Sequence, residues 1–387
     1  MLGLVLEGGG AKGSFHAGVL KALFERGYHF DGVAGTSIGA INGALVAQGD
    51  FDKCYQLWQT VTPSMLFDVD DEKVANLVNS QYDRSTVMYF LRFLRSSIAN
   101  RGLPMDKAEA FLKGYVDEQK LRNSPIDFGI VTVATSDDWM PVEIFKEEIP
   151  QGMMVKYILA SAYLPVFKRS TINGKRFIDG GIYDNLPINP LVRRGYNNII
   201  AVRTMSNMPH SKVIDRSIKV SYISPSESLG NTLSFSSERL NHNLNLGYYD
   251  ALRFTDGLSG KKYYFESLTD GEFRAYLENA YGVPLFKEWA ELLKVRGNKE
   301  RIIITLTRHI NSVVKSDHPD YRAFTALLEP FAAACGLERF KIYSLKEMLG
   351  ELKANFNKIN KSDFDKSKEI DAVLWQIFAV LMENTNI

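Results

Sequence analysis

The chain has 387 residues, of which 45% are hydrophobic and 24% charged; this composition excludes a collagen-like, coiled-coil or mainly disordered chain. The 46 Lys and Arg residues and the 45 Asp and Glu residues leave a net charge of +1, without the basic excess of a nucleic-acid-binding protein. The two cysteines, Cys54 and Cys335, form neither a disulfide framework nor a metal-ligand spacing and fit a reducing cytoplasm.

The six-residue apolar run at the N-terminus has no basic segment before it and does not have the form of a secretory signal peptide. No stretch approaches the ~18 apolar residues of a membrane-spanning helix. The most apolar segment, residues 372–382, is shorter and contains Gln376. We therefore expect a cytoplasmic protein without a membrane span, and contact with a membrane surface stays open.

Strand and helix patterns alternate through the first part of the chain. Strands are predicted over residues 2–7, 30–36, 126–134, 140–145, 175–179 and 198–204. Helices are predicted over residues 14–26, 38–48, 152–163 and 188–194, and residues 51–125 have a helical and irregular pattern. This alternation predicts βαβ units and a mostly parallel sheet.

After about residue 225 the pattern becomes mainly helical. Amphipathic helices are predicted over residues 230–256, 271–296, 301–315, 320–335 and 345–382, with short strands over 262–266 and 340–343. We therefore expect an α/β domain over residues 1–225 and a mainly helical C-terminal region over residues 226–387, to which no function is assigned.

A glycine-rich loop, Glu7 to Gly13, follows the first predicted strand. Gly8, Gly10 and Gly13 match the GxGxxG pattern of dinucleotide sites, with Asp31 as the nearest candidate for the ribose-binding acid. That acid should close the second strand, however, and Asp31 opens it. Consecutive glycines also let N–H groups converge at a helix N-terminus as an oxyanion hole, and a tight turn without a ligand is a third interpretation. The next motif favours the oxyanion hole.

A candidate nucleophile follows the second predicted strand. Gly35-Thr36-Ser37-Ile38-Gly39 is a GxSxG motif at a strand–helix turn, which is the context that the motif requires. The glycines remove clashes around the serine, and the following helix places the positive end of its dipole beneath it. A serine nucleophile needs a base. The histidines are not favoured, because none lies in a glycine-rich turn at a clear strand end: His16, His29, His210, His242, His309 and His318.

Asp179 is the better candidate for the base. It ends the strand predicted over residues 175–179 and precedes Gly180 and Gly181. Asp-Gly is also a common hairpin turn, which is the structural alternative. Because we expect this strand to belong to a parallel sheet, its carboxyl end is a place where sites form. A buried aspartate beside a serine hydroxyl can accept the serine proton.

Together these motifs resemble the patatin-like phospholipase family, in particular its bacterial members. Besides the glycine loop, the GxSxG serine and the Asp-Gly-Gly turn, the resemblance rests on residues 160–167 (ASAYLPVF), 185–187 (NLP) and 246–251 (LGYYDA). It covers about residues 1–255. The family commonly has Arg where this chain has Lys12, and often Asp where it has Glu7.

The resemblance implies a three-layer α/β/α fold and a Ser–Asp dyad. Ser37 would be the nucleophile and Asp179 the general base. Gly9, Gly10 and Ala11 would offer oxyanion N–H groups. The supporting motif residues would be Gly8, Lys12, Gly13, Gly35, Gly39, Gly180 and Gly181.

The implied activity is hydrolysis of lipid esters, with phospholipids or lysophospholipids as substrates, through an acyl-enzyme and without a metal or cofactor. The alternatives are a non-catalytic lipid-binding or regulatory protein on the same fold, and a dinucleotide-binding oxidoreductase. Residues 84–98 combine an apolar, aromatic stripe with Arg84, Arg92 and Arg95. This pattern fits a core helix or a helix at a membrane surface. The sequence indicates no oligomeric state.

Overall fold

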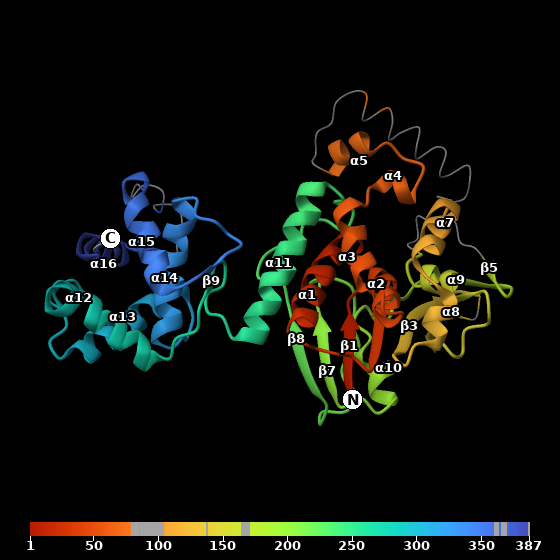
Figure 1. Ribbon diagram of the computed structural model, residues 1–387, viewed down its shortest axis with the longest axis horizontal. Helices are drawn as coiled ribbons and strands as arrows, with labels where there is room; N and C mark the ends of the chain where they lie inside the picture. Colours follow the sequence, from red (N-terminus) through yellow and green to blue (C-terminus); the bar gives the residue numbers. More distant parts are fainter. Residues whose placement is uncertain are drawn as a thin grey trace. The chain divides into compact units, whose positions relative to one another are not determined.

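A computed structural model of the chain describes residues 1–78, 85, 88, 104–136, 138–163, 171–359, 364 and 370–385. The chain divides into two compact units, Met1–Leu252 and Arg253–Ile387 (Figure 1). Residues 226–252, which the sequence assigns to the C-terminal region, belong to the first unit. The predicted helix over 84–98 and the second half of the motif at 160–167 lie outside the described residues, apart from Ser85 and Met88.

The first unit is built on an eight-stranded sheet. Its strands are β1 (Leu2–Leu6), β2 (Gly32–Thr36), β3 (Asp127–Ala134), β4 (Met140–Phe145), β5 (Thr171–Ile172), β6 (Lys175–Asp179), β7 (Asn198–Val202) and β8 (Lys219–Ile223). The strands β3, β2, β1, β7 and β8 are parallel neighbours in that order. The predicted mostly parallel sheet is therefore confirmed, although the sequence analysis missed β5 and the edge strand β8.

Two strands share one edge of β3, end to end. β2 pairs with β3 as far as Thr36 opposite Val131, and β6 pairs with the next residues of β3, with Asp179 opposite Thr132. The other edge of β3 is taken by β4 over residues 129–134. The end of β6 therefore lies directly beyond the end of β2.

β6 runs antiparallel to β3, so the expectation that Asp179 ends a strand of the parallel set is wrong. The reason lies in α9 (Met154–Ala160). Its last residue is held beside β3, because the hydroxyl of Thr132 donates to the carbonyl of Ala160 at 3.1 Å. Because α9 ends at the carboxyl edge of the sheet, β6 enters the sheet from that edge and runs back along β3. The chain turns at Asn173 and Gly174, both with positive φ, as a two-residue hairpin requires.

Helices cover both faces of the sheet, which makes the three layers that the sequence predicted. On one face α1 (Gly13–Glu25), α2 (Ile38–Ala47) and α3 (Phe51–Thr60) pack with α9 around the larger core. On the other face α10 (Ile188–Arg193) covers a smaller core that includes Val5, Leu191 and Ile199. The first unit also has α4 (Pro63–Leu66), α5 (Asp71–Val78), α7 (Asp106–Tyr115), α8 (Glu118–Asn123) and, as far as Leu252, α11 (Ser237–Asp256).

The second unit is mainly helical and has its own core. Its elements are α12 (Asp270–Leu292), α13 (Lys299–Val314), α14 (Asp320–Ala334), α15 (Leu345–Asn355), α16 (Ala372–Asn384) and a parallel pair, β9 (Tyr264–Phe265) and β10 (Ile342–Tyr343). The rings of Phe331 and Phe378 stack at its centre, 3.6 Å apart. Residues 345–382 are predicted to be mostly helical, and within their described part the structure has α15, a 3₁₀ turn over Phe356–Lys358 and α16. None of the helices in the described ranges is both long and apolar enough to cross a membrane.

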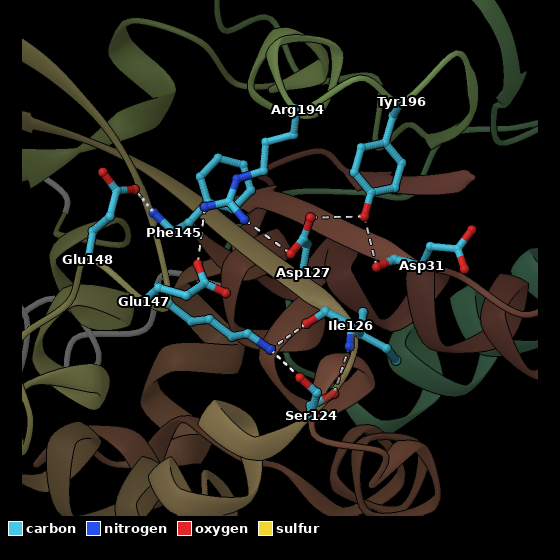
Figure 2. Close-up of polar contacts among 10 residues, drawn as sticks. Asp31, Ser124, Ile126, Asp127, Phe145, Glu147, Glu148, Arg194 and Tyr196 are labelled. Carbon is cyan, nitrogen blue, oxygen red and sulfur yellow. Dashed lines mark hydrogen bonds and ion pairs between the residues drawn. The ribbon is translucent and has the colours of Figure 1, made fainter.

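A polar network closes the amino edge of the sheet (Figure 2). The guanidinium of Arg194 lies 3.6 Å from the ring centroid of Phe145 and forms ion pairs with Asp127 and Glu147, each at 3.1 Å. The hydroxyl of Tyr196 donates to the carbonyl of Asp31 at 2.8 Å and to the carboxylate of Asp127 at 3.1 Å. The strands are therefore tied together where they begin.

Asp31 belongs to this network and not to the glycine loop. Its carboxylate accepts the N–H of Leu2 at 2.7 Å, at the start of β1, whereas the glycine loop follows the end of β1. Because β1 and β2 are parallel, Asp31 and the loop lie at opposite edges of the sheet. Asp31 therefore cannot bind the ribose of a dinucleotide held at the glycine loop, and the dinucleotide interpretation loses its candidate acid.

Candidate active site

Ser37 occupies a strained turn between β2 and α2. Its φ of 55° and ψ of −123° are unusual for a residue with a side chain, and such strain gathers at functional sites. The turn is tight on both sides: a Cβ on Gly39 would lie 2.1 Å from the carbonyl oxygen of Leu6, and a Cβ on Gly35 would lie 2.3 Å from the backbone of Gly39. The two glycines thus permit the turn that presents a half-buried Ser37 at the carboxyl edge.

Asp179 faces Ser37 from the end of β6. Asp179 is 3% exposed. Burial raises its pKa to about 6, against opposing effects of the Gly181 N–H and the Ser37 hydroxyl. The Gly181 N–H donates to Asp179 Oδ1 at 2.7 Å. The structure therefore brings together the two residues that the sequence singles out, with the acid tuned toward neutral pH.

Ser161 connects the turns that carry these two residues. Its hydroxyl accepts the N–H of Ser37 at 2.9 Å and donates to the carbonyl of Val131 at 2.6 Å. Its own carbonyl accepts the N–H of Gly180 at 3.3 Å. Ser161 is fully buried, so one side chain fixes the Ser37 turn relative to β3. Sequence reasoning found Ser161 only within the 160–167 motif and gave it no role.

The glycine loop offers two N–H groups for an anion. Within the part of the chain that the structure describes, neither the Gly9 nor the Gly10 N–H donates to a protein atom, and both residues are half-buried. Gly10 has a φ of 57°, which suits glycine. The third expected donor is engaged: the N–H of Ala11 donates to the carbonyl of Thr232 at 2.8 Å. The reason is a long-range contact, since the backbone of Thr232 lies directly over Gly10.

Glu7 and Asn185 anchor this loop. Glu7 is fully buried, and its carboxylate accepts the N–H groups of Thr204 at 2.6 Å, Met205 at 3.2 Å and Ser206 at 3.3 Å. The carbonyl of Asn185 accepts the Gly8 N–H at 3.0 Å, and its side chain donates to the Gly8 carbonyl at 3.2 Å. Because Asn185 follows the Asp179 turn, it ties that turn to the loop. The sequence offered for Glu7 only its place at the end of the first predicted strand and the resemblance to a family that often has Asp there.

The remaining motif residues line close contacts around the site. A Cβ on Gly180 would lie 2.1 Å from the Val131 carbonyl oxygen, and one on Gly13 would lie 2.5 Å from the Ile38 side chain. A Cβ on Gly181 would lie 2.7 Å from the side chain of Asn185. Lys12 is half-buried in the short turn before α1.

An apolar cavity is lined by residues next to Ser37 and Ser161 in the chain. Ile38, the residue after Ser37, lines it, and so does Ala162, the residue after Ser161. Its walls are almost entirely apolar and include Trp58, Phe67, Leu112 and Phe235. A hydrocarbon chain attached to a carbonyl at Ser37 would find a matching environment there.

No histidine takes part in this arrangement within the described residues. His16 is fully buried against Asn42, and burial lowers its pKa to about 3. His242 pairs with Glu227 at 2.7 Å, and His309 pairs with Asp371 at 2.8 Å in the second unit. The described ranges also hold no group of three or more His, Cys, Asp or Glu residues arranged to bind a metal ion.

Comparison with known proteins places this site in context. Residues 4–192 match the family model described as patatin-like phospholipase. A lysophospholipase named NTE1 from Cryptococcus neoformans var. neoformans serotype D is 30% identical over 204 residues, which are 52% of this chain and 11% of that protein. An uncharacterized NTE family protein of Mycobacterium bovis is 28% identical over 204 residues, which are 51% of this chain and 48% of that protein.

The chain thus spans about a tenth of the fungal relative and about half of the mycobacterial one. Among solved structures, VipD from Legionella pneumophila aligns with a TM-score of 0.42 and 14% identity, over 99% of this chain and 90% of that chain.

Proposed function

Because residues 4–192 match the family model described as patatin-like phospholipase, we propose that the chain is a member of this family and hydrolyses lipid esters through an acyl-enzyme on Ser37. The observation that carries the proposal is the placement of the buried carboxyl of Asp179, with its pKa raised to about 6, against the hydroxyl of Ser37. A carboxyl tuned in this way can accept a proton near neutral pH and return it.

In the first half of the reaction, Ser37 Oγ attacks the carbonyl carbon of the ester while its proton passes to Asp179. The carbonyl oxygen becomes an oxyanion, which the N–H groups of Gly9 and Gly10 stabilise. The tetrahedral intermediate then collapses. The alcohol leaves with the proton held by Asp179, and the acyl group stays on Ser37.

In the second half, water attacks the acyl carbon and gives a proton to Asp179. The second tetrahedral intermediate forms in the same oxyanion site. When it collapses, the carboxylic acid leaves and the proton returns to Ser37 Oγ. Every proton thus passes through one carboxyl, which has to ionise and to become protonated in each cycle.

The substrate class follows from the apolar cavity and from the relatives. The cavity suits an acyl chain, since its lining is almost free of polar groups. The similar fungal protein carries the name lysophospholipase. We therefore infer that phospholipids and lysophospholipids are the preferred esters.

The non-catalytic alternative predicts the same fold without turnover. Against it stand the strained φ of 55° at Ser37 and the buried negative charge that Asp179 carries when ionised, for which the described residues provide no cation. Both features cost stability, and a lipid-binding protein would gain nothing from them.

The test is labelling of the full chain with a fluorophosphonate probe, which reacts with activated serines. We expect labelling of the wild type, none in Ser37→Ala and strongly weakened labelling in Asp179→Asn. The matched control is Asp184→Asn. Asp184 is also a buried acid with a pKa raised by burial, but its carboxylate accepts the N–H groups of Leu186 and Ser211 instead.

Release of fatty acid from lysophosphatidylcholine by the wild type, lost in Ser37→Ala, would then identify the ester. A folded wild type that neither reacts with the probe nor releases fatty acid, with and without detergent micelles, would refute the hydrolase proposal. Equal labelling of Asp179→Asn and the wild type would refute the dyad alone.

A further inference from the structure

Large apolar side chains are exposed beside the candidate active site. Trp139, in the connection from β3 to β4, and Met140, the first residue of β4, are 56% and 61% exposed. Met205, which follows β7, is 51% exposed. Leu233, next to the Thr232 that covers the glycine loop, is 56% exposed. These side chains pack against little in the first unit, although they are among its most apolar.

The sheet topology places the two connections on either side of Ser37. In the sheet β3 neighbours β2, and β7 is separated from β2 by β1. All four strands are parallel, so the chain leaves β3 and β7 at the edge where Ser37 follows β2. Figure 1 shows β1 and β7 ending at the same edge. The exposed apolar side chains therefore flank the site at one edge of the molecule's first unit.

The backbone conformation at these positions argues against chance. Trp139 has a φ of 61° after Asp138 with a φ of 50°, and Met205 has a φ of 51°. Bulky residues are outliers in this left-handed region, where glycine and asparagine are the ordinary choice. The backbone at Met205 has a structural reason, since residues 204–206 wrap around the Glu7 carboxylate. These contacts use only backbone N–H groups, so they do not require an exposed apolar side chain at position 205.

A lipid surface fits this combination of side chains. The indole ring of tryptophan is apolar with one polar edge and prefers the membrane–water interface. The unbranched side chains of Met140 and Met205 adapt to irregular apolar surroundings. A site whose substrate is a lipid ester has to meet that substrate in an aggregate, so apolar side chains around its mouth have a direct use there.

The charges near Trp139 nearly cancel. Asp138 is the preceding residue, and Arg176 is held next to the same connection, because its carbonyl accepts the Thr135 N–H at 2.8 Å and its N–H donates to Ser136 Oγ at 3.2 Å. Lys175 is exposed beside it. The sequence of this connection has two acids, Asp137 and Asp138, against the two bases Lys175 and Arg176. Attraction to anionic lipid is therefore a minor contribution, and apolar insertion has to supply most of the binding.

We propose that Trp139, Met140 and Met205 insert into the surface of a phospholipid bilayer and hold the carboxyl edge of the sheet against it. The role of this membrane contact rests on the proposed function, because the contact would bring the lipid ester to Ser37. The binding itself does not depend on turnover and can be measured in a variant without the nucleophile.

The experiment uses the full chain carrying Ser37→Ala and vesicles of dioleoylphosphatidylcholine. Of the four tryptophans, all within the described residues, Trp139 alone is exposed, because Trp58 and Trp289 are buried and Trp375 is half-buried. We expect a blue shift of tryptophan fluorescence on vesicle addition and quenching by brominated phosphatidylcholine. Both signals should vanish in Trp139→Ala.

Vesicle sedimentation measures the contribution of each side chain. We expect Trp139→Ala and Met205→Asn each to weaken partition onto the vesicles about tenfold. Met205→Asn should also leave the melting temperature unchanged or raise it, because asparagine tolerates a positive φ better. The matched control is Ile214→Asn. Ile214 is 57% exposed and lies nine residues beyond Met205 in the connection from β7 to β8, where its N–H donates to Asn189 on α10; its substitution should not change partition.

Unchanged partition of Trp139→Ala and Met205→Asn would overturn the proposal, as would a fluorescence spectrum that vesicles do not alter. Vesicle-independent self-association that Met205→Asn abolishes would also overturn it, in favour of a second copy as the occupant. Binding without fluorophosphonate labelling of the wild type would refute the proposed function alone. Labelling without vesicle binding would refute this inference alone.

Discussion

The amino and carboxyl edges of the same sheet differ in how their polar groups are paired and in how strained their backbone is. At the amino edge, Arg194, Asp127 and Tyr196 form ion pairs and hydrogen bonds with one another, and none of the three has a positive φ. At the carboxyl edge, Ser37 is strained, and Asp179 is buried. Among the described residues, no cation pairs with Asp179 and no acceptor binds the N–H groups of Gly9 and Gly10. The first edge contributes stability, and the second gives up stability in return for reactivity.

The sharpest test of this contrast is Asp179→Asn. Loss of the base should lower kcat by about 10²–10⁴-fold, while the fold becomes more stable. The pKa of Asp179 is raised from 3.8 to about 6 in the folded state, so its ionised form opposes folding above pH 6. Two pKa units correspond to at most about 3 kcal/mol.

The measurements are ester hydrolysis and chemical denaturation at pH 8 and pH 4. The stability gain of Asp179→Asn should be full at pH 8 and shrink toward pH 4, where the carboxyl is protonated in the folded state and increasingly so in the unfolded state. A loss of stability at pH 8 would break the contrast between the edges. Asp184→Asn serves as the control for a buried acid outside the dyad.

The next largest effect is expected for Ser161→Ala. The substitution leaves the Ser37 N–H without its acceptor and the Val131 carbonyl without its donor. Loss of a buried hydrogen bond costs about 1–3 kcal/mol. As a positioning residue, Ser161 should affect kcat by about tenfold to a hundredfold and leave KM unchanged.

The matched control for Ser161→Ala is Thr132→Val. Thr132 is equally buried, and its hydroxyl donates to the carbonyls of Ala160 and Ile178 and not to the Ser37 turn. It should lose stability without a comparable change in kcat. Equal kcat values for Ser161→Ala and Thr132→Val would show that Ser161 is only structural.

A smaller effect is expected from pH. Asp179 has to be ionised to accept the proton of Ser37, and its pKa is raised to about 6. The value of kcat/KM should therefore rise through pH 6 and reach a plateau above it, and at pH 5 it should be about tenfold below the plateau. A pH–rate profile with a midpoint near 4 would mean that the carboxyl is more solvated than its burial indicates.

The smallest effect should come from the amino edge. Arg194→Lys keeps the charge but loses the flat contact with Phe145 and one of the two ion pairs. Because the Arg194 side chain is partly exposed, we expect a loss of about 1 kcal/mol in the free energy of unfolding and an unchanged kcat. Urea denaturation and steady-state kinetics measure the two quantities. A lower kcat in Arg194→Lys, measured where the variant is fully folded, would show that the amino edge also affects catalysis.

The local motifs could be predicted from the sequence because each lies within a few residues. The glycine loop and the Gly35–Gly39 turn need particular residue types at short spacing, and the spacing is visible in the chain. The helical second unit was equally accessible, since its amphipathic periodicity extends over long segments.

What depended on long-range contacts could not be predicted. The direction of β6 is set by where α9 ends beside Thr132, which no spacing reveals. The Ala11 N–H is taken by Thr232, a residue from far along the chain. The predicted helix over 230–256 begins only at Ser237, because the residues before it cover the glycine loop and are held there.

The end-to-end arrangement of β2 and β6 along β3 makes the length of one hairpin more critical than its composition. Side chains alternate along a strand, so removing one residue between the Asn173–Gly174 turn and Asp179 would turn the carboxyl to the opposite face of the sheet. Every residue type would still be present, yet Ser37 would have lost its neighbour. In the descent of such chains, insertions and deletions between residues 173 and 179 should therefore be rarer than substitutions.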